Sequence, residues 1–296
     1  MSDALRIHSS LRDYAVEFVD DFAVPLARHV REGAFVVCDA KVHALYRDVL
    51  APIVPEGQLL LVEATELGKT MDAAQALIAE LVARQARRHH TIVALGGGVC
   101  EDVAGFTASV LYRGVEWVYF PTTLLSMADS AIGGKTSINV GEKKNLVGTF
   151  YPPSAVYVDT RFLDTLGVDD IRSGLGEILH FYVYADSPLL PDLAAHYSEL
   201  LEDRAGFDAL HGLFVANFPD FDWRRLDLAR YTAALSADKK NVDGGVTCVL
   251  SAGPGKLVKK RLAMDPTLAA LIERYFEGPV GAEPGPVPAL EIADAS

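Results

Sequence analysis

Three consecutive glycines, Gly96, Gly97 and Gly98, separate a short apolar segment from a helical pattern. Glycine lets the backbone approach a pyrophosphate without interference from a Cβ, and a helix N-terminus attracts anions. Asp102 follows within the first helical turn, and Asp39 ends an earlier apolar segment, where it could accept hydrogen bonds from a ribose. The usual G-x-G-x-x-G fingerprint is absent. The pattern therefore indicates either a dinucleotide site of another kind or simply a tight turn.

A dense polar segment comes next in the sequence. Hydroxyl and amide groups suit the hydroxyls of a ribose or a substrate, and lysines suit phosphate or carboxylate. Gly134-Lys135-Thr136 imitates the end of a P-loop, but Asp129 stands where that motif requires its first glycine. We interpret the segment as a polar loop that faces a polyanionic ligand and carries Thr122, Thr123, Asp129, Lys135, Asn139, Lys144 and Asn145.

Alternating strand and helix patterns surround these residues. Apolar runs predict strands at 35–39, 58–62 and 91–95, and helical spacing predicts helices at 41–50 and 70–88. This alternation is typical of an open parallel sheet, in which ligands bind beyond the carboxyl ends of the strands. The sequence therefore predicts an α/β fold.

Beyond about residue 160 the pattern becomes mainly helical. We divide the chain into a nucleotide-binding α/β lobe at 1–158, a mainly helical substrate lobe at 159–277 and a disordered tail at 278–296, rich in Pro, Gly and Ala. Within the second part the patterns predict helices at 169–184, 191–202, 205–215, 227–238 and 266–276 and strands at 246–250 and 257–262.

Composition narrows the class of protein. The chain has 296 residues, of which 50% are hydrophobic, and a net charge of −13, which argues against binding to nucleic acid or a membrane surface. Cys38, Cys100 and Cys248 are widely spaced, as in cytosolic proteins. The sequence has neither a signal-peptide pattern nor an apolar run of ~18 residues. We therefore expect a cytoplasmic protein.

Several motifs in fixed order carry a resemblance to a known family. They are ELGKT from Glu66, GGGVCEDVAGF, the Arg113-Gly114 pair, PTTLLSMADSAIGGKT, the KN of KKNLVGTFYPP, FLDTL, and the GLGE of residues 174–177. Together they resemble the dehydroquinate synthase family, the wider group of NAD-dependent sugar phosphate cyclases.

The resemblance implies a Rossmann-like nucleotide-binding lobe, a mainly helical lobe, and an active site between them. Family members bind NAD and usually zinc or cobalt, act as carbon–oxygen lyases on phosphorylated sugars, and use NAD as a catalyst that is regenerated. For this chain it implies an enzyme of secondary metabolism that acts on a phosphorylated ketose or polyol, and a homodimer.

The family's functional residues can be placed on this sequence one by one. By resemblance, NAD would contact Asp39, Glu66, Lys69, Gly97, Gly98, Asp102, Thr122 and Thr123. The catalytic pocket would be lined by Arg113, Asp129, Lys135, Lys144 and Asn145, and Glu177 would be the first metal ligand.

The resemblance weakens after Glu177. His180 replaces a lysine of the family, Pro254 and Val258 stand where two metal-binding histidines belong, and the later HGE segment is missing. A zinc site with one carboxylate and no imidazole is poor, so we expect no tightly bound zinc. Alternatively, Glu177 and His180, three residues apart on a helix, could hold a metal together with water.

Three functions stay open at this point. The first is a sugar phosphate cyclase-like enzyme that keeps NAD. The second is a metal-independent NAD-dependent oxidoreductase or eliminase, and the third is a non-catalytic partner of a true cyclase. In either enzyme, Asp129 and His180 are candidates for proton transfer, and Lys135 and Lys144 for stabilising oxyanion charge.

Overall fold

The strands of the central sheet direct alternate side chains into two apolar cores. The computed structural model describes residues 4–9, 11–141, 143–184, 245–251 and 257–263. In β3 (Phe35–Asp39), Phe35 and Val37 belong to one core, whereas Val36 and Cys38 belong to the other. The same alternation occurs in β5 (Ile92–Gly96) and β6 (Trp117–Pro121). Because side chains of a strand point to opposite faces in turn, this sheet must be covered on both sides.

The sheet has seven strands in the order β1-β2-β9-β6-β5-β3-β4. The remaining strands are β1 (Leu5–Ile7), β2 (Tyr14–Phe18), β4 (Leu59–Val62) and β9 (Ala155–Val158). Only β1 runs antiparallel to its neighbour. The chain leaves β3 for β4 on one side and then returns to β5 on the other side, so the strand order reverses between β3 and β5. In open α/β sheets this is where ligands bind.

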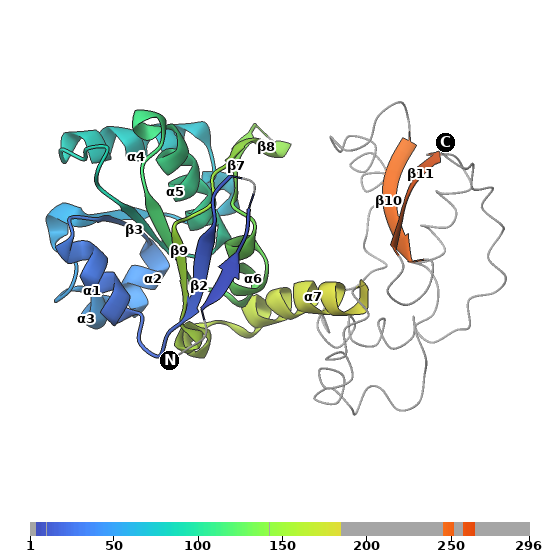
Figure 1. Cartoon of the computed structure of the whole chain (residues 1–296), viewed down its shortest axis with the longest axis horizontal. Coiled ribbons are helices and arrows are strands. Elements are labelled where there is room, and N and C mark those ends of the chain that lie inside the picture. The colour runs from blue at the N-terminus through green and yellow to red at the C-terminus, as the bar shows by residue number, and fades with distance from the viewer. Residues whose placement is uncertain (1–3, 10, 142, 185–244, 252–256, 264–296) are drawn as a thin grey trace. The chain divides into compact units, whose positions relative to one another are not determined.

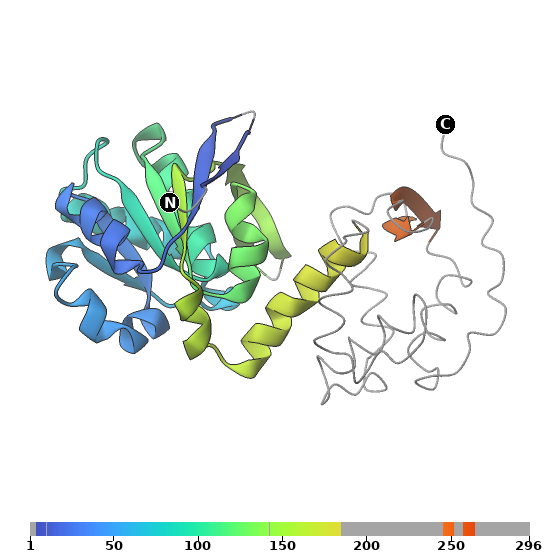
Figure 2. The same cartoon turned by 60° about the horizontal axis from the view of Figure 1, so that its bottom comes forward.

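Helices cover the two faces of the sheet (Figures 1 and 2). One core includes side chains of α1 (Ala23–Arg31), α2 (Ala40–Leu45), α3 (Arg47–Leu50) and the 3-10 helix η5 (Thr160–Thr165). The other includes α4 (Met71–Ala83), α5 (Gly98–Val110) and the hairpin strand β7 (Lys135–Val140). The predicted α/β class with a parallel sheet is confirmed.

Helix boundaries differ from the sequence prediction in two places. The helix predicted at 41–50 is two short helices, α2 and α3, separated by Tyr46, whose ψ of 20° is not helical. The helix predicted at 70–88 ends at Ala83 because Gln85 has a φ of 63°, which a right-handed helix does not allow. The short 3-10 helices are η1 (Glu56–Gln58), η2 (Glu66–Gly68), η3 (Leu111–Arg113) and η4 (Ser130–Ile132).

The segment interpreted as a polar loop is instead regular structure, so that prediction was wrong. It contains α6 (Leu124–Ala128) and an antiparallel hairpin of β7 and β8 (Lys143–Phe150). Thr136 and Ile138 of β7 are buried and Lys135 is exposed, and β7 contacts α5. The alternation of apolar and polar residues that predicts a strand is missing from β7, because polar residues, Thr136 and Asn139, occupy buried positions.

The chain divides into two compact units, residues 1–178 and 179–296, with the boundary inside α7 (Val168–Tyr184). The second unit contains the antiparallel pair β10 (Gly245–Ser251) and β11 (Leu257–Ala263), which confirms the strands predicted there. The helices predicted between 191 and 276 and the tail at 278–296 lie outside the described residues. Among the helices in the described part, none is both long and apolar enough to cross a membrane.

Candidate cofactor and substrate site

A pocket of about 240 Å³ lies at the switch point of the sheet, beyond the carboxyl ends of β3, β5 and β6. Five of the eight predicted cofactor residues line it: Asp39, Gly97, Gly98, Thr122 and Thr123. Sequence reasoning missed other lining residues with polar groups, namely Lys41, Tyr46, Thr165 and Asp170. The structure thus gathers residues from five separate segments of the first unit around one cavity.

Two of the three glycines at this turn, Gly96 and Gly97, are needed for close packing rather than for a left-handed backbone, since none of the three has a positive φ. A Cβ on Gly96 would lie 2.5 Å from Cys100 Cβ, and one on Gly97 would lie 3.0 Å from Thr123 Cγ2. A Cβ on Gly98 would meet nothing closer than Ser130 Oγ at 3.6 Å, an ordinary contact. Gly98, which lines the pocket, is therefore the position of this turn at which a methyl group can be added without disturbing the fold.

The N-terminus of α5 supplies hydrogen-bond donors to the same pocket. Gly97 is the N-cap and makes no side-chain cap, and Gly97, Gly98 and Val99 line the cavity. The first N–H groups of a helix have no partner within the helix and carry partial positive charge. An anion in the pocket can accept these hydrogen bonds.

Thr122 and Thr123 behave differently although they are adjacent. Thr122 Oγ1 is buried and has no hydrogen-bond partner. Thr123 caps α6: its Oγ1 accepts from Ser126 N at 3.2 Å, and its own N–H donates to Ser126 Oγ at 3.2 Å. A buried hydroxyl without a partner costs free energy, so Thr122 is the side chain at this edge that a ligand would satisfy.

Asp39 lies at the end of β3 and begins α2. Its Oδ1 accepts a hydrogen bond of 2.9 Å from Lys41 N. Burial raises the pKa of Asp39, while the Lys41 backbone N–H and the Lys41 charge lower it. This carboxylate is therefore a pre-positioned hydrogen-bond acceptor at the wall of the pocket.

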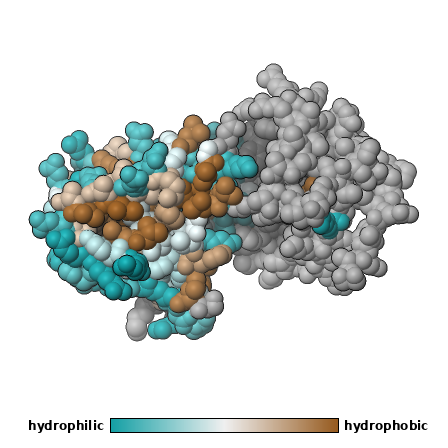
Figure 3. Space-filling model, turned by 90° about the horizontal axis from the view of Figure 1, so that it is seen from above, coloured by the Kyte–Doolittle hydropathy of each residue, from teal (hydrophilic) through white to brown (hydrophobic). Residues whose placement is uncertain are grey.

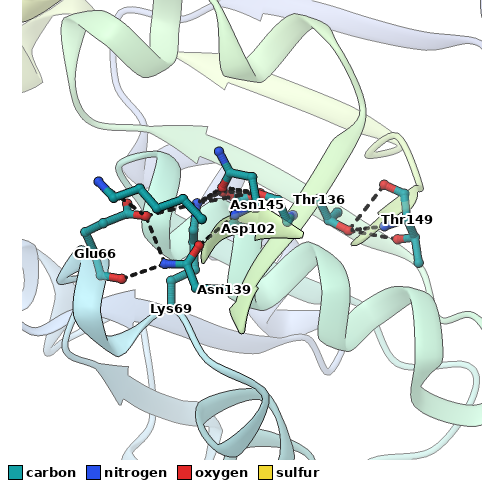
Figure 4. Close-up of polar contacts among 9 residues, drawn as sticks. Glu66, Lys69, Asp102, Thr136, Asn139, Asn145 and Thr149 are labelled. Atoms are coloured by element: carbon teal, nitrogen blue, oxygen red, sulfur yellow. Dashed lines mark hydrogen bonds and ion pairs between the residues drawn. The ribbon is translucent and has the colours of Figure 1, made fainter. Parts of the chain in front are cut away.

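A second polar cluster connects α5, the segment before α4 and the β7–β8 hairpin (Figure 4). The Lys69 ammonium, only 5% exposed, donates to Asp102 Oδ2 at 2.9 Å, Asn145 Oδ1 at 2.6 Å and Ser137 Oγ at 3.3 Å. An ammonium has three N–H donors, so Lys69 uses all of them. We call this cluster, with Glu66, Asn139 and Lys144, the Lys69 network.

The rest of the Lys69 network orders the hairpin. Asn139 Nδ2 donates to Glu66 Oε1 at 2.9 Å, and Asn139 Oδ1 accepts from Asn145 N at 2.8 Å. These contacts hold Asn145 at a φ of 56°, an uncommon value outside glycine. Lys144, 69% exposed, lies 3.9 Å from Glu66 Oε1. The network therefore fixes the position from which Lys144 projects.

Asp102 forms its hydrogen bonds within the Lys69 network and does not line the pocket. Its Oδ1 accepts from Ser137 N at 2.5 Å, and its Oδ2 accepts from Lys69 and from Ser137 Oγ at 3.0 Å. Burial raises the pKa of Asp102, and the Lys69 hydrogen bond and charge act against that shift. In this structure Glu66, Lys69 and Asp102, all predicted to contact NAD, contact one another and the hairpin.

Four other predicted site residues do not line the pocket: Arg113, Asp129, Lys135 and Glu177. Arg113 is exposed beyond the C-terminus of α5, a 13-residue helix about 18 Å long, so it does not border the pocket formed by this chain. Asp129 and Lys135 are exposed, at the end of α6 and the start of β7. Glu177 is half-buried in α7, and His180 follows three residues later in the same helix.

The donor groups present do not form a metal site within the part of the chain that the structure describes. Those residues contain no group of three or more His, Cys, Asp or Glu side chains that could hold an ion. Pro254 lies outside them, whereas Val258 lies in β11, paired with Leu250. Glu177 alone offers one carboxylate, which is too few ligands for zinc.

Comparison with known proteins places these features in a family. Residues 59–173 match the family model described as 3-dehydroquinate synthase N-terminal. The 3-dehydroquinate synthase of Thermoanaerobacter pseudethanolicus is 34% identical over 209 residues, which cover 68% of this chain and 59% of the relative. That of Alkaliphilus oremlandii is 44% identical over 150 residues, which cover 51% and 41%. The chain thus spans about half the length of the curated relatives it matches.

Solved structures agree with this assignment. The structure of ValA, 2-epi-5-epi-valiolone synthase from Streptomyces hygroscopicus subsp. jinggangensis 5008 with NAD+ and Zn2+ bound, is 30% identical, with a TM-score of 0.58 over 80% of this chain and 69% of ValA. The complex of 2-deoxy-scyllo-inosose synthase with carbaglucose-6-phosphate, NAD+ and Co2+ shares the fold at 19% identity, with a TM-score of 0.70 over 92% of this chain and 99% of that one. This chain belongs to the dehydroquinate synthase family of sugar phosphate cyclases.

Sequence reasoning missed two groups of buried residues. Ser137 in the Lys69 network gave no signal, because a serine in a polar segment looks like a solvated residue. Glu101, beside Asp102, and Tyr119 in β6 are both buried. The signal for Glu101 was available: a second acid in an otherwise apolar helix must be either exposed or specially accommodated.

Proposed function

We propose that the protein is an NAD-dependent, sugar phosphate cyclase-like enzyme, a carbon–oxygen lyase that acts on a phosphorylated ketose or polyol. The observation that supports this proposal best is the pocket at the switch point. There, the glycine turn, the N-terminus of α5 and the unpartnered Thr122 hydroxyl come together. The family and the NAD-bound relative ValA support the same cofactor.

The residues around the pocket fit the parts of NAD. The N–H groups at the start of α5 would hold the pyrophosphate, and Asp39 would accept hydrogen bonds from a ribose. The Thr122 hydroxyl would gain the partner that it lacks. When bound, NAD supplies a reversible hydride acceptor, which acidifies the carbon next to the oxidised one.

The β7–β8 hairpin would hold the phosphorylated end of the substrate. Lys135 and Lys144 are exposed cations on this hairpin, and the Lys69 network fixes the backbone from which Lys144 extends. Lysine is a compact point charge that suits phosphate. Asn145, whose amide lies in the same network, would position the substrate hydroxyls.

Metal-assisted chemistry is not part of this proposal, because Pro254 and Val258 stand where two metal-binding histidines of the family belong. Without a resident Lewis acid, the lysine charges would stabilise developing oxyanions. Asp129 and His180 remain our candidates for proton transfer, since a histidine titrates near neutral pH without much tuning.

A second candidate is a metal-independent oxidoreductase or eliminase on the same scaffold. The sequence departures Pro254 and Val258 favour it, because they remove two family histidines. A non-catalytic partner of a true cyclase is the remaining alternative. A role in secondary metabolism and a cytoplasmic location stay with the proposal as expectations.

Homodimerisation is also a proposal. Apolar side chains of the β7–β8 hairpin are exposed, among them Val140, Leu146 and Phe150. On the face of the first unit seen in Figure 3, apolar patches lie among hydrophilic residues. Light scattering coupled to gel filtration would give twice the mass of one chain, 31.9 kDa, for a homodimer and the single mass for a monomer.

One experiment separates these functions. The purified protein, with its NAD content determined by absorbance and its metal by elemental analysis, is incubated with a panel of ketose, heptulose and heptulosonate phosphates. Phosphate release without net NADH supports a cyclase-like lyase, and accumulating NADH supports an oxidoreductase. A protein that is inert on the whole panel but co-purifies with an active cyclase would contradict the proposal.

A further inference from the structure

Glu101 is a buried carboxyl group that neither polar cluster uses. It lies in the first turn of α5, three residues after Gly98 of the pocket, and only 2% of its surface is exposed. Acidic side chains are almost never so deeply buried without a cation as partner. The nearby Lys69 already gives its three N–H groups to Asp102, Asn145 and Ser137.

The surroundings of Glu101 favour its neutral form. The titratable groups that face it are Asp102 on the same helix, Asp129 after α6, Tyr119 on β6 and Tyr14 on β2, and the helix also carries the buried Cys100. Burial is the main reason that the pKa of Glu101 is raised to about 8, and the carboxylates of Asp102 and Asp129 act in the same direction. The hydroxyls of Ser130 and Tyr119 oppose this shift without cancelling it.

Tyr119 connects Glu101 to the glycine turn. Its hydroxyl donates a hydrogen bond of 3.3 Å to Gly96 O. The same hydroxyl acts on the Glu101 carboxyl group by lowering its pKa. A phenol has one hydrogen to donate. While Glu101 is neutral, the Tyr119 hydroxyl can keep its hydrogen bond to Gly96 O, and the Glu101 carboxyl group can donate a hydrogen bond to the phenol oxygen. Once Glu101 ionises, the carboxylate competes with Gly96 O for the same hydrogen.

We propose that Glu101 is a positioning residue of the cofactor turn. As a neutral acid it acts through Tyr119 to keep Gly96 and the start of α5 arranged for a pyrophosphate. The pocket therefore binds NAD with a proton retained on Glu101. Ionisation would also place a carboxylate at the helix end that the pyrophosphate needs, so the two anions would compete for the positive end of α5. This inference rests on the proposed function, because it concerns the affinity for NAD.

The test is calorimetric titration of NAD into the full chain from pH 6.5 to 9.5. In the wild type, affinity is expected to fall above pH 8 by up to about tenfold per pH unit, the limit for one linked proton. Glu101→Gln, which is neutral at every pH, should bind NAD with a flat profile. Asp72→Asn is the matched control, since Asp72 lies in the first turn of the neighbouring helix α4 but is exposed. It should keep the wild-type profile.

Two further measurements keep the proposal testable if Glu101→Gln does not fold. Titration of the wild type near pH 8.5 in two buffers of different ionisation enthalpy should reveal proton uptake on NAD binding, approaching one proton per site. Tyr119→Phe, which removes the connecting hydroxyl, should reduce the pH dependence. Equal profiles for the wild type and Glu101→Gln, or binding without proton uptake, would overturn this inference alone. Absence of NAD binding at every pH would overturn the proposed function and this inference with it.

Discussion

The pocket at the switch point and the Lys69 network differ in whether their polar groups have hydrogen-bond partners within the protein. The pocket is formed by backbone N–H groups, glycines and a threonine hydroxyl, Thr122, that has no partner. In the Lys69 network each ammonium hydrogen of Lys69 and both carboxylate oxygens of Asp102 have partners within the protein. Polar groups without a hydrogen-bond partner are available to a ligand, whereas polar groups with partners stabilise the fold. Of the predicted cofactor residues, Thr122 fits the first description, and Glu66, Lys69 and Asp102 fit the second. Asp39 and Thr123 line the pocket but already cap α2 and α6.

Loss of Lys69 should produce the largest effect. Lys69→Met would leave the buried Asp102 carboxylate without its cation and should lower the free energy of unfolding by about 3–5 kcal/mol. Urea denaturation measures this. The matched control, Lys144→Met, removes a 69% exposed lysine and should cost less than about 1 kcal/mol. The double variant Lys69→Met/Asp102→Asn should recover much of the loss; if it does not, the pair does not hold the network.

Stability should depend on pH through Glu101. Its pKa in the folded protein is raised to about 8 from 4.5, so the folded state binds the proton more tightly than the unfolded state between these values. The contribution of Glu101 to the free energy of unfolding is therefore fully present below about pH 4.5. It is lost as pH rises toward 8, at up to about 1.4 kcal/mol per pH unit. Urea denaturation of the wild type and Glu101→Gln at pH 6 and 8 should show a difference that grows with pH. A constant difference would contradict the assignment.

A methyl group at Gly96 should destabilise the fold. Its Cβ would lie 2.5 Å from Cys100 Cβ and 3.2 Å from Asp39 Cβ, so α5 or β3 would have to move. Overpacking of this kind costs about 1–3 kcal/mol, visible as a lower Tm. Gly57→Ala serves as the control because a Cβ there would meet nothing within 4 Å. Equal Tm values for the two variants would show that the packing at the turn is looser than the structure indicates.

The smallest expected change in stability is at Thr122. Thr122→Val replaces a buried hydroxyl without a partner by a methyl group, so the ligand-free protein should be unchanged or up to about 1 kcal/mol more stable. Its affinity for NAD should fall several-fold if the hydroxyl binds the cofactor. Denaturation together with NAD titration checks both parts. A destabilised protein with unchanged NAD affinity would assign Thr122 to the fold and not to the pocket.

Much of this division could be predicted from the sequence. Apolar runs placed β3, β4 and β5 nearly correctly, and the glycine turn with Asp39 indicated the pocket, because these signals are local. The Lys69 network could not be predicted, since its hydrogen bonds join residues up to 76 positions apart. Polar residues at buried positions also concealed β7. Motif resemblance pointed to residues that the structure places at the pocket or in the Lys69 network, but it could not say which of them line the pocket and which contact one another.

Calorimetric titration of NAD into the wild type, Gly98→Ala and Gly57→Ala tests the central claim most directly. A Cβ on Gly98 would contact only Ser130 Oγ, at 3.6 Å, so this variant should fold with an unchanged Tm. Because that methyl group would occupy space beside the N-terminus of α5, the affinity of Gly98→Ala for NAD should be at least about tenfold lower than that of the wild type, equivalent to about 1.4 kcal/mol. Gly57→Ala should bind as the wild type does. Equal affinity of Gly98→Ala and the wild type, or no binding to the wild type at millimolar NAD, would contradict the account.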